Sequence, residues 1–552
     1  MTELHRSKSF VWALFLIFTL CWFYALGVRT LVPTDEGRYA EMAREMFMTG
    51  DWITTRLNGI KYFEKPPLQT WMNALTFASF GLGEWQARLW TGLCGWFGVI
   101  AVAVTGTRMF NARVGFVAAL ILGSSLLWIA LGHINSLDMG LAAMMTIALC
   151  GLLLGQRNDA DVGEKRGWMW LCWAGMALAV MSKGLIGVVL PGAVLVLYTL
   201  FSRDWSIWKR LYPIGGLLVF FAITTPWFVL VSLKNPEFPH FFFIHEHWQR
   251  FTSPVHHREG PWYYFIPILA LGILPWLGML LQSLWGTPGE DRRGFQPRKM
   301  LLVWAVFIFV FFSISSSKLP SYILPIFPAL ALLMACYLER ASNLAITISA
   351  GLLALISGIG LFFVPKIATM TKVPFELPLY AAYMPWVEAA AICALVGSVL
   401  AMWLANRHKQ WALVVLASTG FFSTQILMLG HEPLGRHAAG IMHVPAVLAE
   451  LTPDIPIYSV GRYEQALPFY LQRTTILVEH ADEMAFGLTQ EPHLWIPELA
   501  TFITKWNADH VAGKKSIAII RPGIYKQLQE QGLPMRVLGE DPRRVIVTNA
   551  VN

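Results

Sequence analysis

Two short stretches place a carboxylate beside a segment that is long enough to cross a membrane. In "PTDEGRYAEM", Asp35 follows the first apolar segment, and in "INSLDM", Asp138 lies between two later ones. If both loops lie on one side, two carboxylates face the same membrane surface. Such a pair suits glycosyl transfer, because charge develops on the sugar and on the leaving group. Alternatively, Asp35 complements a helix dipole and Asp138 caps the next span.

A helix is predicted to hold Asp35. Thr34 is a suitable N-cap, apolar residues follow at helical spacing, and Gly50 is suited to end the helix. Arg38 and Tyr39 come one turn after Asp35 on the same side. The pattern predicts an amphipathic helix that lies on the membrane surface rather than crossing it.

Two cationic residues are candidate ligands for a lipid phosphate. Lys65 stands in "YFEKPPLQTW", where two prolines stiffen the chain and Tyr62 lies close by. Arg250 lies in a second long outer loop. A cation at the depth of the membrane surface needs an anionic partner, and a lipid phosphate supplies one.

The second outer loop is also rich in histidine. His245 and His247, together with Glu64 of the first loop, could hold a divalent ion such as zinc, magnesium or manganese. The HExxH spacing of a zincin is absent from the sequence, so that type of site is not indicated. The alternative is that the histidines donate hydrogen bonds to lipid headgroups. No other cofactor is expected.

Three further residues are candidates for lining the site. Lys318 and Tyr322 belong to "SSSKLPSY", a turn made rigid by proline, and Lys183 belongs to "SKGLIG". Lysine and tyrosine are also common at the ends of spans, where lysine snorkels and tyrosine joins the aromatic belt. Both interpretations stay open for these three residues.

The composition identifies the elements that must position these residues. The chain has 552 residues, of which 56% are hydrophobic and 14% charged, against roughly 25% charged in soluble proteins. Apolar runs of about 17 to 25 residues recur, which is the length of a transmembrane helix. All six cysteines fall inside such runs, so no disulfide framework is indicated. The formal charge of +8 does not indicate a nucleic-acid partner.

The fold predicted from these runs is an all-α polytopic membrane domain over residues 1–430, with about thirteen spans. Their ranges are near 10–29, 85–110, 114–133, 139–155, 168–181, 184–202, 211–231, 262–284, 300–315, 322–338, 344–363, 384–405 and 411–430. Every loop assigned to the inner side is short and carries arginine or lysine, as the positive-inside rule requires. The long loops, about 30–84 and 232–261, and the C-terminus are then on the outer side.

Residues 431–552 have a different pattern. The short β-branched runs "IPIYSV", "TTILVE", "SIAIIR" and "RRVIVT" alternate with helical stretches such as "YEQALPFYLQ". This alternation predicts a small α/β domain outside the membrane.

At the level of whole motifs, residues 1–430 resemble the C-type glycosyltransferases of the protein O-mannosyltransferase-like superfamily, which use polyprenyl-phosphate sugars. The resemblance is carried, in order along the chain, by "TDEGRYAEMAREM", "GDW", "YFEKPPLQTW", "INSLDM", "SKGLIG" and "SKLPSYILPIFPALA". Within the superfamily, the sequence is most similar to the bacterial lipid A aminoarabinose transferases.

The resemblance implies an inverting pentosyltransferase in the bacterial inner membrane, with its active site and C-terminus in the periplasm. The donor would be 4-amino-4-deoxy-L-arabinose on undecaprenyl phosphate and the acceptor a lipid A phosphate, a modification that gives resistance to polymyxin. Membrane lipids would surround a monomer. A phosphate acceptor is already ionised, so Asp35 would orient it or balance positive charge rather than act as a base.

Two alternatives remain open at the level of the sequence. One is a related transferase that moves mannose or another sugar to protein or glycan. The other is a lipid-linked sugar flippase, which should carry polar residues along a path through several span centres. The span interiors are nearly free of charge, which favours the enzyme.

Overall fold

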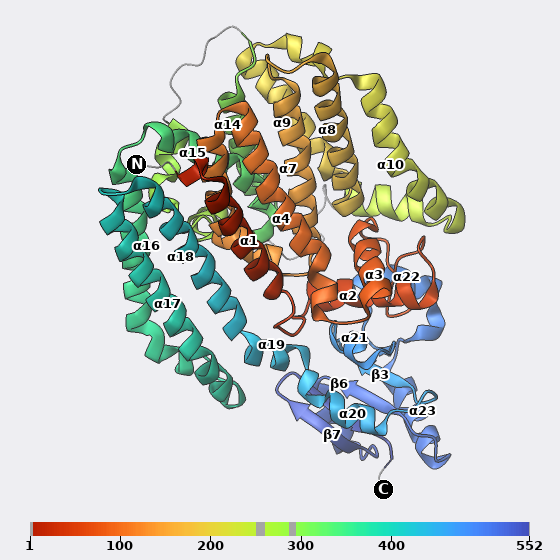
Figure 1. The fold of residues 1–552 in the computed structure, drawn as a ribbon. Coiled ribbons are helices and arrows are strands. Elements are labelled where there is room, and N and C mark those ends of the chain that lie inside the picture. Colours follow the sequence, from red (N-terminus) through yellow and green to blue (C-terminus); the bar gives the residue numbers. More distant parts are fainter. Residues whose placement is uncertain (1–3, 250–259, 286–293, 551–552) are drawn as a thin grey trace.

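The structure is a computed structural model that describes residues 4–249, 260–285 and 294–550. Figure 1 shows a bundle of long helices, with the strands of the C-terminal part gathered at one end of it, next to α2, α3 and α21. The predicted residue Arg250 lies outside the described residues, and so does the side chain of His247.

Eight helices of the described residues are long and apolar enough to cross a membrane. They are α4 (Glu84–Met109), α7 (Leu137–Gly155), α10 (Pro213–Lys234), α14 (Pro297–Ile314), α15 (Phe327–Arg340) with the preceding turn η5 (Pro320–Ile326), α16 (Asn343–Phe363), α17 (Leu377–Ala405) and α18 (Lys409–Gly430). Two bent pairs raise the number to ten. They are α5 (Ala112–Ser124) with α6 (Leu126–Gly132), bent by 65°, and α12 (Phe265–Gly272) with Leu277–Trp285, bent by 112°.

The polytopic helical fold is therefore confirmed, while the number of thirteen spans stays a prediction. The other three predicted spans also fall on helices. These helices are α1 (Lys8–Tyr24) and α9 (Ile186–Ser202), which are apolar but only 17 residues long, and α8 (Val162–Lys183), which starts with charged residues. Helix α7 is buried along almost its whole length, whereas α10 and α17 expose most of their apolar side chains. Exposed apolar side chains are what a lipid-facing helix requires.

The C-terminal part contains one six-stranded sheet in the order β5-β4-β3-β6-β8-β7. Strands β3 (Ile457–Val460), β4 (Ile476–Val478), β5 (Trp495–Ile496) and β6 (Ile517–Ile520) run parallel, and β7 (Arg536–Asp541) and β8 (Arg544–Thr548) form an antiparallel hairpin beside β6. The four predicted strands coincide with β3, β4, β6 and β8. The helices of this part are α19 (Glu432–Ala439), α20 (Val444–Glu450), α21 (Leu467–Leu471), α22 (Ala485–Gln490), α23 (Leu499–Val511) and α24 (Pro522–Glu530).

The first outer loop links the bundle to this sheet. It contains α2 (Asp35–Thr49), the short strands β1 (Arg56–Leu57) and β2 (Ile60–Lys61), and α3 (Leu68–Phe80). Asn58 and Gly59 form the two-residue turn between the strands, both with positive φ, as a type I′ turn requires. The Asn58 side chain donates to the carbonyl of Thr475 at 2.7 Å and accepts from its N–H at 2.6 Å.

Helix α2 is more enclosed than the sequence predicts. An amphipathic helix on the membrane surface should leave its polar face in water, but every residue from Glu36 to Met46 is buried. The C-terminal part covers that face. A Cβ atom added at Gly37 would lie 2.5 Å from the backbone oxygen of Gln465, so only glycine allows this approach. Arg44 and Glu41 form an ion pair on this covered face at 2.6 Å, and burial raises the pKa of Glu45 well above its usual value.

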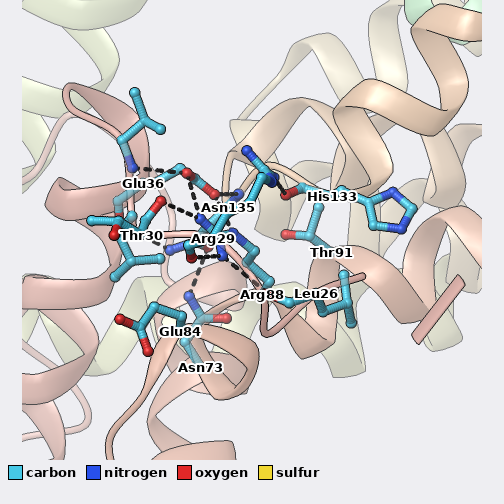
Figure 2. A network of polar contacts seen from close by, with 12 residues as sticks. Leu26, Arg29, Thr30, Glu36, Asn73, Glu84, Arg88, Thr91, His133 and Asn135 are labelled. Atoms are coloured by element: carbon cyan, nitrogen blue, oxygen red, sulfur yellow. Dashed lines mark hydrogen bonds and ion pairs between the residues drawn. The ribbon is translucent and has the colours of Figure 1, made fainter. Parts of the chain in front are cut away.

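A buried ion pair fixes the start of α2. Glu36 and Arg88 of α4 are both fully buried, and Arg88 donates to both carboxylate oxygens of Glu36, at 2.6 and 2.8 Å (Figure 2). Its other N–H groups bind the carbonyl oxygens of Leu26, Arg29 and Thr30. Burial alone raises the pKa of Glu36, but the charge of Arg88 outweighs it, and the pKa of this carboxyl lies below its usual value.

The same carboxylate holds the loop that precedes α7. Glu36 accepts the backbone N–H of Asn135 at 2.9 Å, and the Asn135 side chain donates to the Glu36 carbonyl at 3.1 Å (Figure 2). In turn, Gln69 and Asn73 of α3 donate to the Asn135 side chain. Asp35 and Asp138 are one and three residues away from this network, so the network sets the positions of both.

Replacing Glu36 with glutamine should destabilise the protein strongly. The substitution keeps the shape but leaves Arg88 buried without its counter-ion, a change that costs about 3–5 kcal/mol. The measurement is the midpoint of thermal unfolding in detergent. Glu237→Gln is the matched control, because it breaks the partly exposed pair with Lys61 (2.7 Å), whose loss costs about 1 kcal/mol or less. Equal unfolding temperatures for the two variants would contradict the central role of the pair.

Candidate active site

A cavity of about 1340 Å³ lies where the helical bundle meets the C-terminal part. One wall is apolar and comes from α14, with Phe307, Val310 and Phe311. The rest of the lining is partly polar, and its charged side chains come from five separate regions of the chain. Its charged members are Arg29, Asp35, Glu36, Arg38, Glu64, Lys65, Asp138, Lys183, Asp482 and Glu483. An apolar wall beside a charged one fits a molecule with a hydrocarbon chain and an anionic head.

Asp35 is the first residue of α2 and lines the cavity. Its carboxylate lies 3.5 Å from the guanidinium of Arg38, and its side chain is 44% exposed, which leaves it accessible from the cavity. Arg38 is held from the other side by Glu483 at 2.8 Å, a residue of the C-terminal part. The ring of Tyr62 lies 6.0 Å from the Arg38 guanidinium. Tyr62 is outside the described lining, so it supports Arg38 instead of facing the cavity.

Asp138 and Lys183 form an ion pair in the cavity wall. Asp138 lies in the first turn of α7 and Lys183 is the last residue of α8, and the ammonium group of Lys183 donates to the Asp138 carboxylate. The same ammonium group lies 4.7 Å from the centre of the Tyr322 ring. The structure thus brings together three of the predicted residues. Lys183 thus balances the charge of Asp138 within the cavity wall.

Other predicted residues lie in or beside the cavity lining. Tyr39 and Glu64 line it, and so does Lys65, whose ammonium group donates to the Glu64 carbonyl at 2.8 Å and lies 3.8 Å from its carboxylate. Burial, together with the charge of Asp35, raises the pKa of the Tyr39 phenol, so Tyr39 keeps its proton. Burial also raises the pKa of Glu483, against the effect of Arg38.

Two predicted residues point elsewhere. Lys318 is buried and donates to the carbonyl of Ser315, and it does not belong to the described lining, although Ser315 does. His245 stacks on Phe241, with ring centres 5.1 Å apart. In the part of the chain that the structure describes, no three His, Cys, Asp or Glu side chains form a group that could hold a metal. The metal site with Glu64, His245 and His247 stays a prediction, since it includes a side chain outside that part.

Several residues of the site were missed by reasoning from the sequence. Arg88 carried a usable signal, because a charged residue inside an apolar span requires a buried partner. The sequence contains no signal for Glu483, because its partner Arg38 lies 445 residues away in the chain. Arg29 and His431, which also line the cavity, stand alone in short connecting segments without a recognisable motif.

Comparisons with known proteins agree with this arrangement. Residues 443–549 match the family described as "Aminoarabinose transferase C-terminal domain", and residues 64–230 match "Dolichyl-phosphate-mannose-protein mannosyltransferase". The undecaprenyl phosphate-alpha-4-amino-4-deoxy-L-arabinose arabinosyl transferase of Edwardsiella ictaluri is 30% identical over 538 residues, which covers 92% of each chain.

Solved structures give the same relationship. The crystal structure of ArnT from Cupriavidus metallidurans bound to undecaprenyl phosphate is 42% identical, with a TM-score of 0.93 over 99% of this chain and 98% of that one. The apo form of the same protein gives a TM-score of 0.92 at 41% identity. The similarity extends over both the helical bundle and the C-terminal sheet. The chain therefore belongs to the family of undecaprenyl phosphate-aminoarabinose arabinosyl transferases, which are multi-pass membrane glycosyltransferases.

Proposed function

We propose that the protein transfers 4-amino-4-deoxy-L-arabinose from undecaprenyl phosphate to phosphate groups of lipid A, and so confers resistance to polymyxin and other cationic peptides. The observation that carries the proposal is the cavity of a chain in this family. In that cavity, Asp35, Lys65 and the Asp138–Lys183 pair share the lining with apolar side chains of α14. Two lipid substrates can meet there while their hydrocarbon chains stay in the membrane.

The donor would lie with its prenyl chain against α14 and its phosphate near Lys65. Arg250 would be the second cation for that phosphate. When the bond between the sugar and this phosphate breaks, the electron pair stays on the phosphate oxygen, and negative charge increases there. Cations fixed before the reaction stabilise this charge without having to move, which lowers the barrier.

The acceptor would be a phosphate oxygen that attacks the anomeric carbon from the opposite face, so that the configuration is inverted. A phosphate needs no general base near neutral pH. Asp35 then has an electrostatic role: its carboxylate balances positive charge on the sugar and on the donor's amine. Lys183 would hold the acceptor phosphate, and Asp138 would keep the Lys183 ammonium group in place.

The site and the C-terminal part would lie in the periplasm, with the chain in the bacterial inner membrane. This orientation follows from the basic loops on the opposite side and from the odd number of predicted spans. It also fits the chemistry, since both lipid substrates would reach the cavity from one leaflet.

The first test compares lipid A from a bacterial strain that lacks this protein with lipid A from the same strain carrying it. Mass spectrometry should show the mass of one or two aminopentoses added at phosphate in the complemented strain only. Asp35→Asn serves as the inactive control. Addition of a sugar to protein or glycan, with unmodified lipid A, would exclude the proposed acceptor.

Asp35→Asn should reduce the rate of transfer by about 10²-fold or more, because it removes a charged group that acts on the transition state. Its unfolding temperature should stay near that of the wild type, since the carboxylate is partly exposed.

Asp138→Asn should lower both the transfer rate and the unfolding temperature, because it leaves Lys183 without its partner. Asp51→Asn is the matched control: it lies in the same outer loop, pairs with Lys234 at 2.9 Å and does not line the described cavity. If Asp35→Asn transfers the sugar at the normal rate, the role of Asp35 is limited to capping α2.

A reporter enzyme that is active only in the periplasm should be active when fused after Asn552. The control is the same reporter inserted between Arg157 and Lys165, in a loop assigned to the cytoplasm, where it should be inactive. Cytoplasmic behaviour of the C-terminal fusion would mean that the number of spans is even.

A further inference from the structure

The cavity also contains two residues to which the reaction described above gives no role. Arg29 comes from the segment between α1 and α2, and His431 is the residue that follows α18. Both line the same cavity as Asp35 and Lys183, and Tyr383 and Thr424 lie in the lining with them. A permanent cation and an imidazole thus belong to the lining of this cavity.

Arg29 is a buried cation. Its side chain is 6% exposed, and one of its terminal nitrogens donates to the backbone oxygen of His133 at 2.7 Å (Figure 2). Within the residues that the structure describes, Arg29 forms no direct ion pair, although the charges of Glu36 and Glu432 act on it. The nearest carboxylates have other partners, since Glu36 is paired with Arg88, and Glu432 accepts the N–H and hydroxyl of Thr30.

His431 adds a second group that can bind an anion. Its ring meets the Tyr383 ring edge-to-face, with centres 6.0 Å apart. Burial and the charge of Arg29 lower the pKa of His431, while Glu36 and Glu432 act in the opposite direction. The ring is therefore neutral near pH 7, and a bound anion would favour its charged form.

A buried guanidinium without a carboxylate is costly, and an anionic ligand in the cavity would remove that cost. The fork of N–H groups on arginine matches the oxygens of a phosphate and can bind two of them at once. We propose that Arg29 and His431 form a second phosphate subsite, which holds a phosphate of the acceptor lipid other than the one that reacts. The inference rests on the proposed function and adds that the enzyme prefers acceptors with two phosphates.

Steady-state transfer to three acceptors tests this subsite: lipid A with both phosphates, and the two forms that lack one phosphate or the other. Undecaprenyl phosphate-linked aminoarabinose is the donor in each case. The wild type should show the lowest KM for the doubly phosphorylated acceptor. Arg29→Gln should raise that KM about ten- to a hundred-fold, the effect of losing one charged hydrogen bond, while kcat and the KM for the singly phosphorylated forms change little. Arg29→Lys should recover part of the difference.

His431→Gln keeps the test valid if Arg29→Gln does not fold, because no structural hydrogen bond depends on the His431 ring within the described chain. His431→Gln should also raise the KM for the doubly phosphorylated acceptor. Arg436→Gln is the matched control: it removes an exposed cation one turn further along, outside the described lining, and should have no effect.

The outcomes separate this inference from the proposed function. If the wild type modifies none of the three acceptors, the proposed function fails. If it modifies all three with equal KM, or if Arg29→Gln raises KM equally for all of them, the second subsite is excluded. Adding phosphatidylglycerol vesicles distinguishes the remaining source of a phosphate. The proposal would be overturned if this lipid increased the transfer rate of the wild type but not of the variants, and if the wild type showed no preference for acceptors with two phosphates. Arg29 would then bind a membrane headgroup.

Discussion

The buried pair of Glu36 and Arg88 is the constraint on which the rest of the site depends. Moving two charges out of water is costly, and such a pair is tolerated only when the remaining hydrogen-bonding positions are filled. Here they are: the guanidinium binds the carboxylate and three backbone oxygens, and the carboxylate also accepts two backbone N–H groups (Figure 2). The partners belong to the segment before α2, to α4 and to the segment before α7. One ion pair thus joins α4 to the two segments that precede Asp35 and Asp138.

The C-terminal part contributes directly to the cavity. Glu483 holds Arg38 beside Asp35, and Asp482 lines the cavity itself. Backbone atoms near Gln465 press against Gly37, two residues after Asp35. The lining of the cavity is therefore formed by two parts of the chain with different architectures, a helical bundle and an α/β sheet, and Arg38 is held by carboxylates from both.

The sequence was most informative where a physical requirement is local. The length of the apolar runs located the helices of the bundle, while their number as membrane spans stays a prediction. The β-branched runs located β3, β4, β6 and β8. Charged residues next to apolar runs indicated Asp35, Asp138 and Lys183, which line the cavity. It was least informative about contacts between distant segments. Helix α2 is buried by residues that lie more than 400 positions later in the chain. Lys318 donates a hydrogen bond within its own loop, and its spacing in the sequence does not indicate this contact. The position of Arg250 stays a prediction, because it lies outside the described residues.

The hairpin turn at Asn58 has a consequence for the biosynthesis of the protein. Its side chain exchanges hydrogen bonds with Thr475, 417 residues further along the chain. During synthesis, the segment that carries Asp35 leaves the ribosome well before Thr475, so it cannot make these contacts until the later segment has been synthesised. Until then, the side chains around Leu57 and Ile60, fully buried in the finished protein, have no cover from the C-terminal part. A chain that stops before Thr475 has all its apolar membrane helices but lacks Asp482 and Glu483, so the lining of the cavity is incomplete.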